Sequence, residues 1–238
     1  MRRKKGFGIF LALAAVAFIA TVALVSPLFQ IRQIDIVGNG ATNTEDILNQ
    51  AQIIQGQNML AFSASNVRTR INLLPHVKEV EVLREFPDRV IISITERIPV
   101  ANIRVAHSGT YLLIDDAGMV LAARPQPTEG LPVAIGIDFA NFAIGEYLDV
   151  ESNIIFRDII QLSRVFVRHN FSPDVVDMSN PLDIVLQTCN INILFGEMTD
   201  LDRKMWYAAA IIDQFETDDR GFIDIRDINI PPRFGLLR

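Results

Sequence analysis

The chain has 238 residues, half of them hydrophobic, and a formal charge of −6 from 22 Lys and Arg against 28 Asp and Glu. Four basic residues come before residue 6, so the rest of the chain has 18 basic against 28 acidic residues, a formal −10. This acidic balance argues against nucleic acid as a ligand, and the single cysteine excludes a fold held by internal disulfides.

Residues 7–25 form an uncharged run of nineteen residues, mostly Phe, Ile, Leu, Val and Ala. As a helix rising about 1.5 Å per residue, the run reaches about 29 Å, close to the roughly 30 Å hydrocarbon core of a bilayer. The following Ser26-Pro27 disfavours further helix. We therefore expect a single transmembrane helix over residues 7–26.

The segment before this run, residues 1–6, is basic at Arg2, Arg3, Lys4 and Lys5. Positive residues stay on the cytoplasmic side, so the chain after the span is expected outside the cytoplasm, in a single-pass type II orientation. The alternative is a cleaved signal peptide, whose small-x-small cleavage pattern should follow the apolar core. The best matches lie inside the core instead, so we favour an uncleaved anchor.

Residues 29–97 predict a small domain in the order strand, helix, helix, strand, strand. A strand-like run from Phe29 to Ile36 ends at Gly38-Asn39-Gly40, a turn signal. Thr42 and Glu45 are spaced as a capping box for the first helix. Ser63 or Ser65 caps a second helix, which Pro75 ends.

The two strands that follow are expected at 79–82 and 90–95, joined by a turn at 85–88. Two helices on one face of a three-stranded sheet would bury a common core. Glu96-Arg97-Ile98-Pro99 then reads as a hinge at the domain boundary, with a partner-binding patch as the alternative.

After residue 101 the sequence predicts a larger, β-rich domain with two helices. Its expected elements are a hairpin over 111–121, a loop over 124–132, a helix from Ile154 to His169, a hairpin from Ile184 to Phe195, a helix over 201–215 and a last strand over 222–228. Asn190 is expected to be the left-handed residue of the second hairpin, and Thr199 or Asp200 the cap of the second helix. The predicted fold class is therefore α+β.

Sequence signatures of catalysis are missing. No nucleophile elbow, zincin motif, P-loop or dinucleotide-binding glycine pattern occurs, and the three histidines are scattered. Asp115-Asp116 and Asp218-Asp219 lie in turns, where aspartates usually accept hydrogen bonds from backbone amides. We therefore expect no enzymatic activity, no metal and no cofactor, although a cleft joining His169, Cys189 and a carboxylate would favour a membrane-tethered hydrolase.

The order of elements over 29–97 resembles that of the POTRA domain, and the motifs resemble the FtsQ/DivIB family of bacterial cell-division proteins. The matching residues are Ile34-Asp35-Ile36-Val37-Gly38-Asn39, Glu45-Asp46-Ile47-Leu48, Gly56-Gln57-Asn58-Met59-Leu60, Leu74-Pro75-His76-Val77 and Phe86-Pro87-Asp88 through Ile94-Thr95-Glu96-Arg97-Ile98-Pro99-Val100-Ala101. In the second half, the Asp-Asp-Ala-Gly hairpin, Leu194-Phe195-Gly196, Leu201 with Lys204, and Ile223-Asp224-Ile225-Arg226 resemble the family's β-domain.

The resemblance implies a POTRA domain over 29–98, a β-domain over 99–230 and a C-terminal tail over 231–238. It implies a non-enzymatic scaffold of the septal division machinery in the cytoplasmic membrane, with an extracytoplasmic domain that binds FtsB/DivIC-like and FtsL-like bitopic proteins and septal peptidoglycan synthase components, but no nucleic acid or small-molecule substrate. An outer-membrane assembly or secretion factor with several POTRA units is the alternative.

A terminal strand can leave its outer backbone groups free to pair with a partner's strand. We therefore expect partner binding along the last predicted strand, at Phe222, Ile223, Asp224, Ile225, Arg226 and Ile228. Trp206 lies outside the apolar stripe of its helix, which suits an interface anchor or a tryptophan at the rim of the core.

Overall fold

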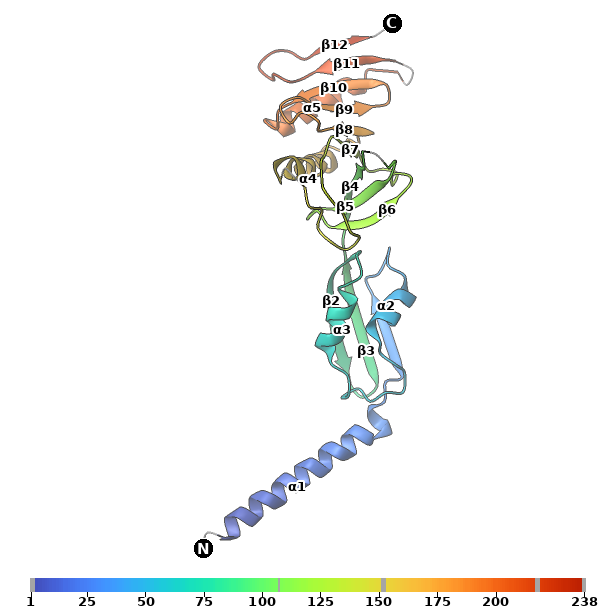
Figure 1. Cartoon of the computed structure of the whole chain (residues 1–238), viewed down its shortest axis with the longest axis vertical. Helices are drawn as coiled ribbons and strands as arrows, with labels where there is room; N and C mark the ends of the chain where they lie inside the picture. Colours follow the sequence, from blue (N-terminus) through green and yellow to red (C-terminus); the bar gives the residue numbers. More distant parts are fainter. Residues whose placement is uncertain (1–2, 107, 151–152, 217–218, 237–238) are drawn as a thin grey trace. The chain divides into compact units, whose positions relative to one another are not determined.

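The computed structural model describes residues 3–106, 108–150, 153–216 and 219–236 (Figure 1). The chain divides into two compact units, Met1–Arg97 and Ile98–Arg238. Each unit has its own sheet and its own buried apolar cluster, and both combine helices with strands. The α+β class is therefore confirmed.

The first helix, α1, spans Arg3–Val25. Its side chains between residues 9 and 18 are exposed, among them Ile9, Phe10, Leu11, Leu13, Val16 and Phe18. Among the residues that the structure describes, no helix is both long and apolar enough to cross a bilayer. The side chains at 1–8, 19–20 and 23–25 lie outside that description, and with them the predicted orientation residues Arg2, Arg3, Lys4 and Lys5.

Residues 27–97 contain the predicted order of elements. The elements are the 3₁₀ helix η1 (Pro27–Phe29), β1 (Gln33–Val37), α2 (Thr44–Ala51), α3 (Ala64–Ile71), β2 (Val77–Glu85) and β3 (Arg89–Glu96). The strands form a three-stranded sheet in the order β1-β3-β2, with β1 parallel and β2 antiparallel to β3. The expected strand start at Phe29 is wrong, because Ser26 caps η1 and β1 begins at Gln33.

The helices of this unit begin at polar caps. Asn43, rather than the predicted Thr42, caps α2, because its Oδ1 accepts the Glu45 amide at 3.0 Å. Ser63 caps α3 as one of the two predicted candidates. Ile47 and Ile71 of these helices are fully buried against the sheet. Both belong to the buried apolar cluster of this unit, as expected for two helices that cover one face of a three-stranded sheet.

The second unit is built on one large sheet. Over the described part of the unit, nine strands follow the order β12-β11-β10-β9-β8-β7-β4-β5-β6 (Figure 1). They are β4 (Pro99–Arg104), β5 (Tyr111–Asp115), β6 (Val120–Arg124), β7 (Val133–Ile135), β8 (Val175–Asp177), β9 (Ile184–Thr188), β10 (Ile191–Gly196), β11 (Gly221–Asp224) and β12 (Arg233–Leu236). The helices α4 (Asn153–Arg168) and α5 (Leu201–Ile212) share a continuous core with it.

Both predicted hairpins are confirmed as β5–β6 and β9–β10. The left-handed residue of the second is Cys189 (φ 50°), so the prediction of Asn190 is wrong. Asp200 is the N-cap residue of α5, although its side chain caps no amide. The predicted last strand is too long, because β11 ends at Asp224, and Asp218 of the turn before it lies outside the described residues. The expected tail over 231–238 contains a further strand, β12.

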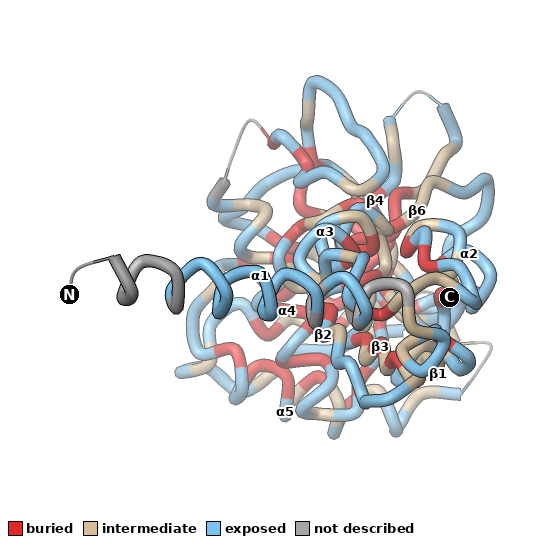
Figure 2. The backbone as a smooth tube through the Cα atoms, turned by 90° about the horizontal axis from the view of Figure 1, so that it is seen from below, coloured by how far each residue is buried: buried red, intermediate tan, exposed pale blue. Residues whose placement is uncertain are grey.

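In Figure 2 the buried stretches (red) lie mostly in strands and helices of the two units, whereas the described part of α1 and many of the connecting loops are exposed.

Candidate partner-binding surface

The C-terminal end of the second sheet is made by three strands, β10, β11 and β12. β11 pairs parallel with β10 and antiparallel with β12. Its Gly221 amide donates to Asn190 O at 3.4 Å, and the Ile225 amide just after it donates to Leu194 O at 3.1 Å. Backbone groups of alternate residues point to opposite sides of a strand. The backbone of Phe222 and Asp224 therefore faces β12.

The expected free edge at 222–228 is thus misplaced, because β11 is paired on both sides. The free edge belongs to β12. Arg233 and Gly235 stand opposite Asp224 and Phe222, so their backbone groups face β11. The N–H and C=O groups of Phe234 and Leu236 then point away from the sheet. No other strand of the described chain pairs with this side of β12.

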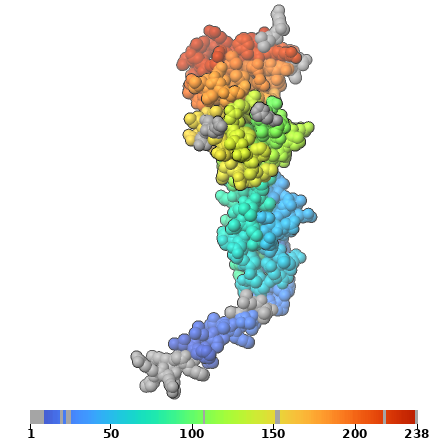
Figure 3. All heavy atoms as spheres, in the orientation of Figure 1, coloured from blue at the N-terminus to red at the C-terminus, as the bar shows by residue number. Residues whose placement is uncertain are grey.

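The β12 backbone approaches Gly221 of β11 closely because Gly221 has no side chain. A Cβ placed on Gly221 would lie 2.3 Å from the Gly235 carbonyl oxygen. On the face shown in Figure 3, the C-terminal residues (red) lie together at one end of the second unit. Glycine at position 221 is therefore a requirement for the close approach of the edge strand.

The edge strand carries exposed apolar side chains. Phe234 is 60 % exposed and still contacts Phe215 edge to face, with the ring centroids 6.2 Å apart. Leu236 and Ile230 are also exposed. An open row of backbone groups beside exposed apolar side chains has the features of a strand-accepting site.

The predicted site residues on β11 and after it take different positions. Ile223 and Ile225 are buried in the core and Phe222 is half-buried. Arg226 binds the Asp224 carboxylate through Nε at 3.0 Å and Nη2 at 2.7 Å, which lowers the pKa of Asp224. Ile228 is half-buried beside them. These residues lie on β11 or directly after it, so they are next to the edge strand β12 and do not form the edge.

A buried lysine, Lys204, ties α5 to the end of β10. Its Nζ donates to the carbonyls of Phe195 at 2.9 Å and Glu197 at 2.8 Å, and only 1 % of the residue is exposed. Burial lowers the pKa of Lys204, against the opposing effect of Asp200 and Glu197. No role was predicted for Lys204 from the sequence. Its place between Leu201 and Met205 on the apolar face of α5 was the signal for a buried, paired cation.

Trp206 lies on the opposite, solvent side of α5 and is 60 % exposed. It contacts Tyr207 edge to face at 5.2 Å, and the Arg203 guanidinium lies 6.0 Å from the Tyr207 ring centroid. The prediction that this tryptophan leaves the apolar stripe is confirmed. Its position fits an exposed anchor for a partner rather than a core residue.

The groups that could have formed a hydrolase site have separate partners. His169 Nε2 lies 3.0 Å from Asp202 Oδ1, which Arg168 also contacts at 2.6 Å. The hydrogen bond with His169 and then that with Arg168 lower the pKa of Asp202. Cys189 instead donates its amide to Asp174 at 2.6 Å. Among the described residues, no three His, Cys, Asp or Glu side chains lie close enough to hold a metal.

The aspartates of the first hairpin fill the role expected of turn residues. Asp115 is buried, and its Oδ1 accepts the amides of Ala117 at 2.9 Å and Met119 at 2.8 Å. Asp116 lies on the surface side, 3.6 Å from Arg164. The prediction that Asp115 serves the backbone of the turn is therefore confirmed.

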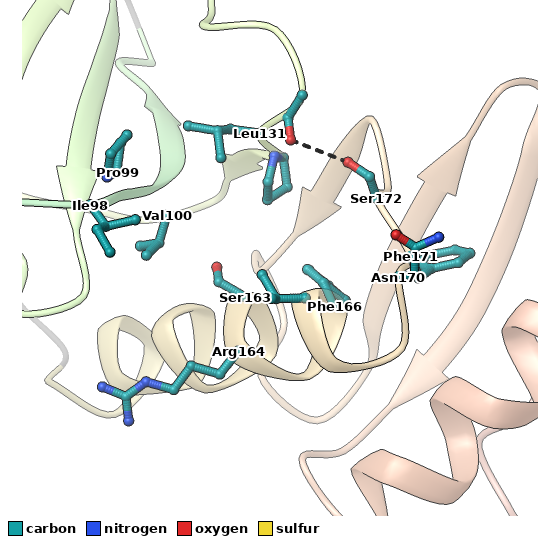
Figure 4. Close-up of a pocket in the computed structure, with 13 residues that line it drawn as sticks. Ile98, Pro99, Val100, Leu131, Ser163, Arg164, Phe166, Asn170, Phe171 and Ser172 are labelled. Carbon is teal, nitrogen blue, oxygen red and sulfur yellow. Dashed lines mark hydrogen bonds between the residues drawn. The ribbon is translucent and has the colours of Figure 1, made fainter. Parts of the chain in front are cut away.

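A cavity of about 480 Å³ lies between the start of β4 and α4 (Figure 4). Asn102 holds one wall, because its side chain bonds the backbone of Thr128 and Leu131. The Ser163 hydroxyl at the opposite wall donates to Ile159 O within the helix at 2.8 Å, and Arg164 is the one charged residue of the lining. The cavity has no acid–base pair for catalysis.

Comparisons with known proteins found a family model that matches within the first unit and relatives that match over most of the chain. Residues 29–97 match the model of the POTRA domain, FtsQ-type. The chain is 26% identical over 204 residues to the cell division protein DivIB of Clostridium tetani, covering 84% of this chain and 76% of that protein. It is 26% identical over 213 residues to DivIB of Clostridium acetobutylicum (88% and 84%). It is 27% identical over 230 residues to the cell division protein FtsQ of Syntrophotalea carbinolica (94% and 79%).

Proposed function

Because the chain belongs to the FtsQ/DivIB family of cell-division proteins, we propose that it is a membrane-anchored division scaffold that binds its partners through the open edge of β12. The family relationship supports a role in cell division. The observation that carries the binding mode is the row of backbone groups at Phe234 and Leu236 that no strand of the described chain uses.

The anchor in this proposal is the segment 7–26. It is helical from Arg3 to Val25 and uncharged from Phe7 to Val25. The Thr21 hydroxyl donates to the Ala17 carbonyl at 2.8 Å, which satisfies a polar group of the helix internally. The four basic residues before it would hold the N-terminus in the cytoplasm and direct both folded units to the extracytoplasmic side of the division septum.

The partners in this proposal are bitopic division proteins of the FtsB/DivIC and FtsL type, with septal peptidoglycan synthase components as further members of the assembly. A bitopic partner presents an extracytoplasmic segment in the same two-dimensional layer, so its effective concentration is high and a short strand pairing is sufficient for binding. β12 would pair by backbone hydrogen bonds, and Trp206 would add an aromatic contact on α5.

The proposal is tested by comparing Phe234→Pro with Phe234→Ala in the full-length protein. Both variants remove the ring, but only proline removes the outward N–H. We expect Phe234→Pro to weaken co-purification of the DivIC- or FtsB-like protein of the same cell at least about tenfold relative to Phe234→Ala, since the edge loses a donor and proline interrupts pairing. Equal co-purification with both variants, each shown folded by circular dichroism, would contradict strand addition at β12.

A further inference from the structure

The topology of the first unit brings three connections to one end of its sheet. β1 and β3 are parallel and both start at this end, while the antiparallel β2 finishes there. The segment between α2 and α3, residues 52–63, joins them through backbone bonds. Ile31 donates to Gln57 O at 2.9 Å and Met59 donates to Phe29 O at 2.8 Å. This end is also where the chain arrives from α1 through η1.

The β2–β3 turn belongs to the same cluster. The rings of Phe29 and Phe86 meet edge to face with centroids 6.0 Å apart. Arg32 donates its amide to Asp88 O at 2.8 Å, and Arg84 reaches across to the carbonyl and ring of Phe62. Segments that are far apart in the sequence therefore form one continuous surface.

This surface exposes large apolar side chains that nothing in the described chain covers. We call them the anchor-end patch: Leu28, Ile54, Leu60, Leu83 and Phe86, which are between 42 and 69 % exposed. Scattered exposed leucines are ordinary, but a group of large apolar residues on neighbouring turns marks a contact surface.

The short segment between α1 and Leu28 limits how far the patch can lie from the end of α1. Leu28 follows Val25, the end of α1, by three positions, so the Cα atoms of these two residues lie at most about 11 Å apart. The headgroup region of a leaflet is roughly 5–8 Å thick. If α1 spans the membrane, the patch therefore begins inside the interfacial layer or within a few Å of it.

The charges at this end offset one another. Arg89 pairs with Asp35 and Glu85, and Arg32 lies 3.8 Å from Asp88. Such a balance provides no strong attraction to anionic headgroups. Attraction to the bilayer would come from burying apolar side chains in the interface, as for amphipathic segments that lie in the membrane plane.

We propose that the anchor-end patch is a lipid contact surface that inserts Phe86 and its apolar neighbours into the interfacial layer of the bilayer. This inference rests on the membrane anchor of the proposed function. The contact would hold the POTRA domain against the membrane by a second attachment and so restrict its rotation about the short connection after α1. It would depend little on salt or on the fraction of anionic lipid.

The test uses the full-length protein in lipid vesicles. In a Trp206→Phe background, a single tryptophan is introduced by Phe86→Trp or, as a matched control, by Leu73→Trp. Leu73 is 68 % exposed in the same domain but lies after α3, next to the start of β2, at the opposite end of the sheet. Vesicles contain either ordinary phosphatidylcholine or the same lipid brominated near the headgroup end of the chains.

We expect brominated lipid to reduce the fluorescence at position 86 about twofold and to leave that at position 73 unchanged, in both low and high salt. Equal signals at the two positions, in protein that floats with the vesicles and resists alkaline extraction, would overturn the lipid contact while leaving the anchor intact. Protein that fails to float would overturn the anchor of the proposed function, and the lipid contact with it.

Discussion

The two units use opposite charges for the same task at the ends of their sheets. In the first unit, the Glu96 carboxylate at the end of β3 accepts the amides of Ala41 at 2.8 Å and Thr42 at 2.7 Å. In the second unit, the Lys204 ammonium donates to the carbonyls of Phe195 and Glu197. Each side chain holds a loop whose backbone groups have no strand or helix to pair with.

The pKa of each group is lowered, but for opposite reasons. Burial alone would raise the pKa of Glu96, yet the hydrogen bonds from residues 40–42 outweigh it and lower the pKa to about 2. For Lys204, burial dominates and opposes the charged form. The comparison teaches that the hydrogen bonds to Glu96 stabilise its charged state, whereas Lys204 is charged at a buried position because it satisfies the carbonyls of Phe195 and Glu197. The lysine clamp should therefore be the more costly one to remove.

The largest effect is expected for Lys204→Met. Methionine fills the space but leaves the carbonyls of Phe195 and Glu197, one buried and one partly buried, without this donor. The loss costs about 2–4 kcal/mol in the free energy of unfolding of the second unit. Chemical denaturation monitored by Trp206 fluorescence measures it. The control Arg203→Met removes a charge from the exposed neighbouring position and should cost less than about 0.5 kcal/mol. Similar losses for the two variants would show that Lys204 is not a clamp.

The next effect concerns the strand pair behind the proposed edge. Gly221→Ala places a Cβ 2.3 Å from the Gly235 carbonyl, so β12 must shift, at a cost of about 1–3 kcal/mol. Partner co-purification should fall together with stability. Gly40→Ala, whose Cβ would make only an ordinary contact at 3.4 Å with Glu96, is the control. An unchanged partner complex in Gly221→Ala would mean that the position of β12 does not govern binding.

The smallest of the three effects belongs to Glu96→Gln, and it depends on pH. A carboxyl whose pKa falls from 4.5 in the unfolded chain to about 2 in the fold stabilises the fold above pH 4.5 and loses this contribution as pH falls toward 2. After solvent screening we expect about 1–2 kcal/mol at pH 7. Hydrogen exchange of the Ala41 and Thr42 amides, compared in wild type, Glu96→Gln and the exposed control Glu81→Gln, measures it. A difference between wild type and Glu96→Gln that is as large at pH 2 as at pH 7 would contradict the account.

The two units also differ in how much of their structure the sequence could predict, because the first depends more on local signals and the second more on distant contacts. The strands and α-helices between residues 33 and 96 were all predicted because each has a local signal, such as the alternating valines of β2 or the apolar spacing of α3. Errors there were small shifts, as when Asn43 took the cap expected of Thr42. Both residue types cap helices. Asn43 takes the cap of α2, while the backbone amide of Thr42 donates to Glu96 instead.

The second unit was predicted less completely because several strands depend on distant partners. β7 and β8 have three residues each and pair in parallel through Val133 and Val175, forty-two positions apart. β12 was missed because Pro231-Pro232 reads as an end and Gly235 weakens the strand pattern. Pairing with β11 overrides that local preference. The free edge was therefore predicted at β11, whereas the open edge at this end of the sheet belongs to β12.

Hydrogen exchange at the β12 amides tests the central claim most directly. The full-length protein is compared alone and with its DivIC- or FtsB-like partner. The account predicts that exchange at Phe234 and Leu236 slows on binding, because their outward N–H groups become paired, while exchange at Gly235, already paired with β11, changes little. Unchanged exchange at Phe234 and Leu236 in a complex shown to be saturated would contradict binding by strand addition at this edge.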